Sequence, residues 1–77
     1  MNRKTISESV REAVAGYLEA MDDQQVTDLY EMVQTEVEAP LLACVLEYTE
    51  NNQSQTAQIL GLNRGTLRKK LRKYRLL

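Results

Sequence analysis

The apolar residues of this 77-residue chain recur at intervals of three and four along almost its whole length. That spacing puts them on one face of an α-helix, whereas the side chains of a strand alternate with a period of two. The sequence contains neither a sustained alternation of period two nor an Asn-Gly pair that would mark a hairpin. We therefore predict an all-α protein, and at this length a single compact domain.

The first helix is marked at its start by Thr5 and Glu8, which form a capping-box pattern. We expect a helix of about 17 residues that ends near the polar cluster at positions 22–25. Gly16 lies inside it, either as a tolerated defect of about 1 kcal/mol relative to alanine or as a point of close helix approach. The predicted apolar stripe is Ile6, Val10, Val14, Tyr17, Leu18 and Met21.

Pro40 lies in the middle of a second apolar stripe. Proline removes a helical hydrogen bond and normally kinks or ends a helix. The four-residue spacing nevertheless continues across it without a change of phase, so we expect one long kinked helix over residues 27–49, capped by Thr27 or Asp28. The alternative is two helices that meet at residues 38–39. The stripe is Leu29, Val33, Val37, Leu41, Val45 and Tyr48, widened by Met32, Leu42, Leu46 and Cys44, a small hydrophobe that we expect to be buried.

Residues 52–75 read as a short helix, a turn with glycine, and another helix. Asn52, with Gln55 three residues on, caps a helix that stops at Gly61, a typical residue just beyond a helix end. Asn63 caps the last helix, over about residues 64–75. This order and spacing predict a helix-turn-helix. Ala57 lies where the two helices must approach closely, and the buried stripe of the last helix is Leu67, Leu71 and Tyr74.

The net charge of −1 conceals a split between the two parts of the chain. Residues 1–50 hold 3 basic and all 11 acidic residues, a charge of −8, whereas residues 51–77 hold seven basic residues and no acidic one. Arginine can make two hydrogen bonds to guanine, and lysine or threonine can reach phosphate oxygens. Unrelieved positive charge beside a helix-turn-helix spacing therefore indicates that the last helix contacts DNA. The seven bases are Arg64, Arg68, Lys69, Lys70, Arg72, Lys73 and Arg75.

Several other classes of protein are disfavoured by what the sequence lacks. It has no histidine, one cysteine and no glycine-rich phosphate loop, so we expect no enzyme, no cofactor, no metal site and no small-molecule substrate. No apolar run approaches the ~20 residues that span a bilayer, and no signal-peptide apolar region is present, so we expect a cytoplasmic protein without membrane contact. A chain this small buries only about 60% of its unfolded surface, which favours an oligomer.

Four segments of the chain resemble the Fis family of bacterial nucleoid proteins over roughly residues 8–75. The C-terminal segment is the most specific, although the same motif also ends enhancer-binding transcriptional activators, which carry it after a large ATPase domain. The segments are Asp28-Leu29-Tyr30-Glu31, Val37-Glu38-Ala39-Pro40-Leu41-Leu42, Tyr48-Thr49 and Gly61-Leu62-Asn63-Arg64-Gly65-Thr66-Leu67-Arg68-Lys69-Lys70-Leu71-Arg72-Lys73-Tyr74.

The resemblance implies a homodimer of four helices per subunit. Residues 1–49 would form an intertwined dimerisation core, whose second helix is kinked at Pro40, and residues 50–77 the helix-turn-helix unit. The two recognition helices would stand closer together than one DNA turn, so the duplex must bend, and A/T-rich centres are favoured. The implied dimer core is Val10, Val14, Tyr17, Leu18, Met21, Leu29, Val33, Val37, Leu41 and Val45.

The resemblance also assigns the DNA contacts by position. Asn63, Arg64 and Arg68 are the expected base contacts. For Asn63 a base contact is compatible with capping, because an amide both accepts and donates. Asn52 similarly combines a cap with a nearby phosphate. The expected backbone contacts are Asn52, Ser54, Thr66, Lys69, Lys70, Arg72 and Lys73.

The implied function is sequence-tolerant DNA binding and bending by a nucleoid-associated transcriptional regulator, with RNA polymerase as a further candidate partner. Family members carry an N-terminal arm that touches a DNA invertase, and the five residues before Ile6 are too few for it, so we expect bending without activation of inversion. Glu50 and Gln55 stand where basic residues are common, which predicts weaker wrapping of flanking DNA. The alternatives are a detached DNA-binding domain of an enhancer-binding activator and a helical protein-interaction adaptor.

Overall fold

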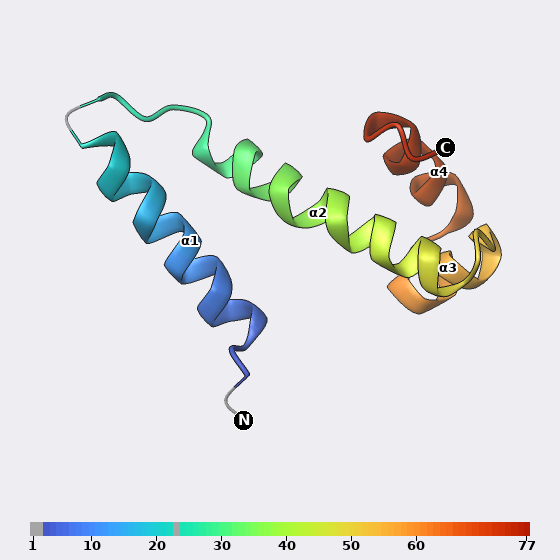
Figure 1. The fold of residues 1–77 in the computed structure, drawn as a ribbon. Coiled ribbons are helices and arrows are strands. Elements are labelled where there is room, and N and C mark those ends of the chain that lie inside the picture. The colour runs from blue at the N-terminus through green and yellow to red at the C-terminus, as the bar shows by residue number, and fades with distance from the viewer. Residues whose placement is uncertain (1–2, 23) are drawn as a thin grey trace. The chain divides into compact units, whose positions relative to one another are not determined.

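The computed structural model describes residues 3–22 and 24–77, which form four helices and no strand. The helices are α1 (Ile6–Met21), α2 (Leu29–Tyr48), α3 (Gln53–Leu60) and α4 (Arg64–Lys73) (Figure 1). The predicted all-α class with four helices is confirmed. The chain divides into two compact units, Met1–Val33 and Gln34–Leu77.

In the first unit, α1 begins at the predicted cap. The Oγ1 atom of Thr5 accepts a hydrogen bond from the backbone N–H of Glu8 at 3.0 Å, which satisfies one of the free donors at the helix start. No residue of α1 is buried, but four of its apolar side chains are half-buried along one stripe. Asp23, part of the polar cluster predicted to end this helix, lies outside the described residues. The half-buried residues are Val10, Val14, Tyr17 and Met21.

Helix α2 runs without interruption through Pro40, as predicted. It begins where the carbonyl of Asp28, a residue with φ of 57°, accepts a hydrogen bond from the N–H of Met32 at 3.1 Å. Proline has no N–H, so one turn of the helix lacks a hydrogen bond at that point. The apolar residues on both sides of Pro40 keep the helical phase, and the alternative of two helices meeting at residues 38–39 is not observed.

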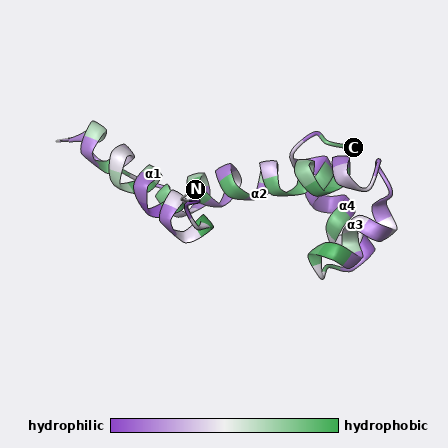
Figure 2. Cartoon of the chain, turned by 60° about the horizontal axis from the view of Figure 1, so that its bottom comes forward, coloured by the Kyte–Doolittle hydropathy of each residue, from purple (hydrophilic) through white to green (hydrophobic). Residues whose placement is uncertain are grey.

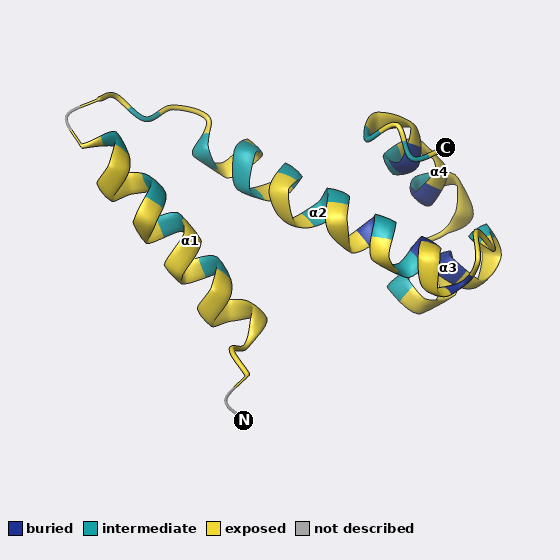
Figure 3. Ribbon diagram, in the orientation of Figure 1, coloured by how far each residue is buried: buried dark blue, intermediate teal, exposed yellow. Residues whose placement is uncertain are grey.

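The second unit holds a small core where α2, α3 and α4 meet (Figure 3). Leu67 and Leu71 of α4 are completely buried, and Ala57 is 3% exposed, so the small side chain lies in the core as predicted. The side chains from α2 are Leu42 and Leu46. Burying a leucine stabilises a fold by roughly 1.5–3 kcal/mol, so these few contacts hold α4 against α2 and α3. Three half-buried residues pack around the core: Leu60, Tyr74 and Leu76.

A pair of buried hydroxyl groups joins the end of α2 to α3. The Oγ1 atoms of Thr49 and Thr56 lie 2.6 Å apart, and Thr49 Oγ1 is also within 3.1 Å of the carbonyl of Leu46. A hydroxyl has one hydrogen, so when Thr49 donates to a carbonyl, Thr56 donates to Thr49. Both buried hydroxyls are then satisfied, which a core of this size requires.

The turn between α3 and α4 depends on Gly61, whose φ of 73° and ψ of 29° are left-handed. Its N–H donates to the end of α3, and the N–H of Leu62 donates to the carbonyl of Ala57 at 2.9 Å. This is the glycine-dependent helix end that the sequence predicts, since other residues pay a steric cost at that φ. Three residues, 61–63, therefore suffice to connect the two helices.

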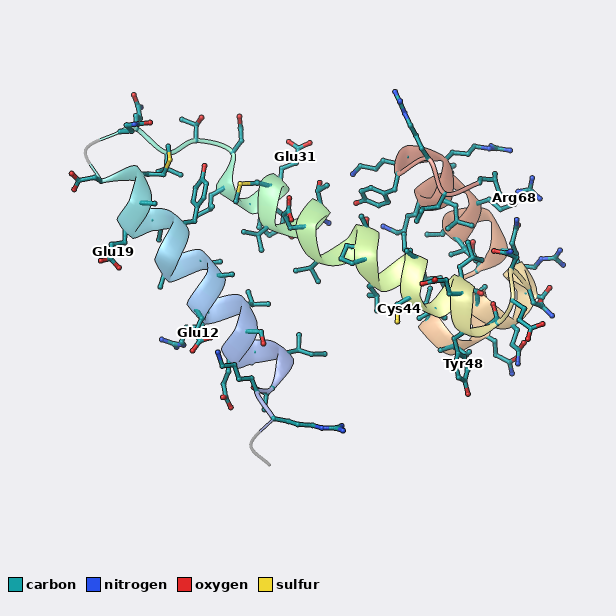
Figure 4. The ribbon with its side chains drawn as sticks, in the orientation of Figure 1. Glu12, Glu19, Glu31, Cys44, Tyr48 and Arg68 are labelled. Atoms are coloured by element: carbon teal, nitrogen blue, oxygen red, sulfur yellow. The ribbon has the colours of Figure 1, made fainter. Side chains whose placement is uncertain are left out.

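Cys44 departs from its prediction, because its side chain is exposed rather than buried. The residues of α2 that reach the core are Leu42 and Leu46, and Cys44 lies between them in sequence. Two residues along a helix correspond to about 200° of rotation, so Cys44 points away from that core. Figure 4 shows Cys44 and Tyr48 projecting from the same side of α2, away from α4. Helix α2 thus carries apolar side chains away from that core as well, among them Val37 and Leu41, which are exposed. Figure 2 shows both hydrophobic and hydrophilic residues along α2.

Candidate nucleic-acid interface

Helix α4 has an apolar side that is fully covered and a charged side that is open to solvent. Leu67 and Leu71 form the covered side. Arg68 extends outward from the unit (Figure 4). A helix whose apolar stripe is buried and whose basic side chains point outward has the form that enters a major groove of DNA. The exposed basic residues of α4 are Arg64, Arg68, Lys69, Arg72 and Lys73.

The N-terminal end of α4 is capped by Asn63, which is exposed. Its Oδ1 atom accepts a hydrogen bond from the N–H of Thr66 at 2.7 Å. An asparagine side chain also has two N–H donors on Nδ2. The cap therefore uses only the oxygen, and the donors that could read a base are not needed for it.

The C-terminal end of α4 comes earlier than expected, at Lys73 instead of about residue 75. Tyr74 is the cap residue, Arg75 is left-handed with φ of 57°, and the N–H of Leu76 donates to the carbonyl of Leu71 at 2.8 Å. This arrangement folds the chain end back onto the core. Arg75 consequently lies beyond the helix rather than on its face.

Two more of the predicted contacts, Asn52 and Ser54, lie at the start of α3. The Oδ1 atom of Asn52 accepts a hydrogen bond from the N–H of Gln55 at 3.0 Å, and both Asn52 and Ser54 are exposed. The residues before Asn52 form a tight turn in which Glu50 and Asn51 both have positive φ, at 54° and 68°. Free backbone N–H groups and small polar side chains at a helix start can bind a phosphate.

One predicted contact, Lys70, has a partner within the unit. Its Nζ atom lies 2.8 Å from Oε2 of Glu38 on α2, and the hydroxyl of Tyr74 donates to Oε1 of the same carboxylate at 2.5 Å. The side chain of Lys70 is 29% exposed and that of Glu38 is 19% exposed. Sequence reasoning missed Glu38, because an ion pair between residues 32 positions apart leaves no local pattern.

The charges in this cluster stabilise one another. The hydrogen bonds from Lys70 and then Tyr74 lower the pKa of the Glu38 carboxyl below its ordinary value. The same carboxylate raises the pKa of Lys70 and the pKa of the Tyr74 hydroxyl. At neutral pH the cluster therefore contains an ionised glutamate, a protonated lysine and a protonated tyrosine.

The residues predicted for a dimer core divide by exposure. Leu18, Val37 and Leu41 are exposed, with Leu41 at 48%, and the other seven are half-buried. Tyr48, on the same side of α2 as Cys44, is 79% exposed. A single chain therefore leaves a run of apolar side chains on α2 in contact with water, which is unfavourable unless a partner covers it.

Within residues 3–22 and 24–77, no three His, Cys, Asp or Glu residues cluster so as to hold a metal ion. In the same ranges no helix is long and apolar enough to cross a membrane.

Comparison with known proteins decides the family. Residues 34–74, which include the whole of α3 and α4, match the family model described as bacterial regulatory protein, Fis family. The chain belongs to the Fis family. The match to the family agrees with the resemblance read from the C-terminal segment.

Relatives extend the similarity beyond the helix-turn-helix. The DNA-binding protein Fis of Psychromonas ingrahamii is 51% identical over 74 residues, which cover 96% of this chain and 75% of the relative. The protein of the same name from Histophilus somni is 50% identical, with 96% of this chain and 76% of the relative covered. That of Haemophilus influenzae is 52% identical over 71 residues, 92% of this chain and 72% of the relative. The similarity thus includes α1 and α2 as well.

Proposed function

We propose that this protein is a DNA-binding and DNA-bending regulator of the bacterial nucleoid that acts as a homodimer and catalyses no reaction. The observation that carries this proposal is the open cationic side of α4, held by a helix-turn-helix core. The relatives named DNA-binding protein Fis support DNA as its ligand. Their similarity over α1 and α2 favours such a regulator over a detached helix-turn-helix of an activator. A nucleoid-bound protein acts in the cytoplasm.

In this proposal the residues at the N-terminal part of α4 read bases. Asn63, Arg64 and Arg68 are exposed, and an arginine can make two hydrogen bonds to guanine O6 and N7 in the major groove. The remaining polar residues around them hold the duplex backbone, which sets position without reading sequence. These backbone contacts are Asn52, Ser54, Thr66, Lys69, Arg72 and Lys73.

DNA contact would show in the salt dependence of binding. A protein that neutralises about 6–10 phosphates loses roughly 10³–10⁵ in affinity between 50 and 200 mM salt. We expect a loss of that order for a short duplex with an A/T-rich centre, measured by fluorescence anisotropy. Binding with a shallow salt dependence, or no duplex binding, would instead favour a protein-interaction adaptor.

The homodimer is supported by the uncovered face of α2. We propose that residues 1–49 dimerise through this face and through the stripe of α1, and that the opposite face of α2 holds the helix-turn-helix of residues 50–77. Leu41 and Ile59 offer a matched test, because they are 48% and 50% exposed and only Leu41 belongs to the proposed interface. Leu41→Asn should shift the mass measured by light scattering from two chains toward one, whereas Ile59→Asn should leave it unchanged. An equal change in mass for the two variants, or no change in either, would count against this interface.

Bending follows from the proposed dimer. Two α4 helices that stand closer than one turn of DNA can enter successive major grooves only if the duplex curves, at a cost of order 1–6 kcal/mol that depends on sequence. Flexible or narrow-grooved A/T centres lower that cost. Circularly permuted probes should therefore migrate differently according to the position of the site, and equal migration of all probes would exclude bending. RNA polymerase is a further partner to test in the same regulatory role.

A further inference from the structure

The carboxylate of Glu38 is placed beside the most basic segment of the chain. It receives two hydrogen bonds from α4 and its cap, one from Lys70 Nζ at 2.8 Å and one from the hydroxyl of Tyr74 at 2.5 Å. Residues 70 and 74 are one helical turn apart, so both donors leave the same side of the helix. Both oxygens of the carboxylate are therefore used to join α2 to the C-terminal half of α4.

The two hydrogen bonds to Glu38 restrict the rotation of α4 about its own axis, which burial of its leucines does not. Burial of Leu67 and Leu71 holds α4 against the core, but apolar contact has no preferred direction, so a helix can roll on it. Hydrogen bonds weaken steeply as their angle departs from linear. Two of them to one carboxylate fix the rotation of α4 about its own axis, and that rotation determines which way Arg64 and Arg68 point.

Lys69 and Lys70 are adjacent in sequence but differ in exposure and in pairing, because Lys70 belongs to the junction formed by Glu38, Lys70 and Tyr74. Lys69 is exposed, whereas the Lys70 side chain is 29% exposed and paired. The Glu38 side chain is 19% exposed with the ion pair in place. If Lys70 moved to a phosphate, the Glu38 carboxylate would remain beside the polyanion without a cation. Uncovering a carboxylate there is unfavourable, because like charges repel at short range.

Taking the proposed DNA binding as given, we propose that Glu38 is the positioning residue of the DNA-contacting helix and that Lys70 serves this junction rather than the DNA backbone. Glu38 acts through Lys70 and Tyr74 and does not touch DNA. Its removal would leave the number of phosphate contacts unchanged and would reduce the ability of the protein to distinguish one sequence from another.

The first test compares two adjacent lysines. Each phosphate contact contributes about 0.9 to the slope of log K against log salt concentration, so a change in both chains of a homodimer removes about 1.8. We expect Lys69→Met to reduce the slope by about that amount and Lys70→Met to leave it unchanged. A slope reduced equally in both variants would overturn the proposal for Lys70.

The second test concerns sequence discrimination. The ratio of affinities for an A/T-centred duplex and a scrambled duplex of the same composition should fall fivefold or more in Glu38→Ala, which corresponds to about 1 kcal/mol. Glu38→Gln keeps an acceptor for Tyr74 and should restore part of the ratio. Glu36→Ala is the matched control, because Glu36 is exposed on the same helix and forms neither ion pair found among the described residues. A ratio in Glu38→Ala equal to that of Glu36→Ala would overturn the positioning role.

The outcomes separate this inference from the proposed function. If the unaltered chain shows no salt-dependent duplex binding, both the proposed function and the roles of Glu38 and Lys70 are refuted. If the unaltered chain binds and Lys70→Met reduces the slope of log K against log salt concentration as much as Lys69→Met does, only the inference about Lys70 and Glu38 is refuted. If Glu38→Ala does not fold, the comparison of the two lysines still decides.

Discussion

Asn63 combines two roles that a pair of substitutions can separate. Its Oδ1 atom caps α4 through the N–H of Thr66 at 2.7 Å, and its amide N–H groups remain for a base. Serine is about as good a cap as asparagine but has no amide, whereas alanine has neither function. Asn63→Ser should therefore keep the stability of the protein and lose the base contact, and Asn63→Ala should lose both.

The expected magnitudes differ enough to be measured. Loss of the cap costs about 1 kcal/mol of unfolding free energy, or roughly 4–8 °C in Tm for a domain of this size. Loss of a base contact made through the amide N–H groups removes about 0.5–1.5 kcal/mol of discrimination per half-site, or roughly 2- to 12-fold in relative affinity. Thermal unfolding followed by circular dichroism gives the first quantity, and anisotropy titrations with duplexes altered at single base pairs give the second.

Two results would refute this reasoning for Asn63. If Asn63→Ser destabilises the protein as much as Asn63→Ala, the hydrogen bond to Thr66 does not act as a cap. If Asn63→Ser keeps full discrimination at every base pair, the amide does not read a base. The exposed Gln58→Ser on α3 is a control for the loss of an amide away from α4.

Three further predictions follow from the same geometry. Arg64→Ala should weaken DNA binding by about 1–3 kcal/mol and relax the preference at one base pair. Lys73→Ala should weaken binding to all duplexes alike, and a loss that depends on the base pair would contradict its assignment as a phosphate contact. Leu71→Ala should lower the unfolding free energy by roughly 2.7–5 kcal/mol in urea titrations, because Leu71 is fully buried, whereas Leu77→Ala, at a residue 53% exposed, should change it by less than about 0.5 kcal/mol. Because the folded-state pKa of Glu38 is lowered, its stabilising effect is present above the unfolded value of about 4.3 and is lost as pH falls through the folded value. The stability difference between the unaltered chain and Glu38→Gln should thus be present at pH 7 and shrink toward zero by pH 2, and a constant difference would contradict it.

The starts of α1, α3 and α4 and the end of α3 could be predicted from the sequence because their signals are local, whereas α4 ends at Lys73 instead of about residue 75. Thr5, Asn52 and Asn63 each cap the helix that follows them, and each bond joins residues three positions apart. Gly61 similarly ends α3 through its own left-handed φ. A helix end determined by adjacent residues leaves a pattern in those residues.

The faces of α2 could not be assigned in the same way. This helix is apolar on two sides, so its spacing predicts that it is buried but does not say which side contacts α4. Leu42 and Leu46, which merely widened the predicted stripe, are the residues of α2 in the core of the second unit, and Cys44 is exposed against expectation. Glu38 was missed for a related reason, because its partners come from another helix. Contacts between elements depend on packing that no local spacing encodes.

The proposed function requires that a pair of chains presents two α4 helices to one duplex. Sedimentation equilibrium of the protein with a short duplex carrying one A/T-centred site measures the mass of the complex directly. We predict two chains per duplex at 50 mM salt, and dissociation of both together as salt is raised. A complex with one chain per duplex, or no complex at all, would refute the proposed dimeric binding.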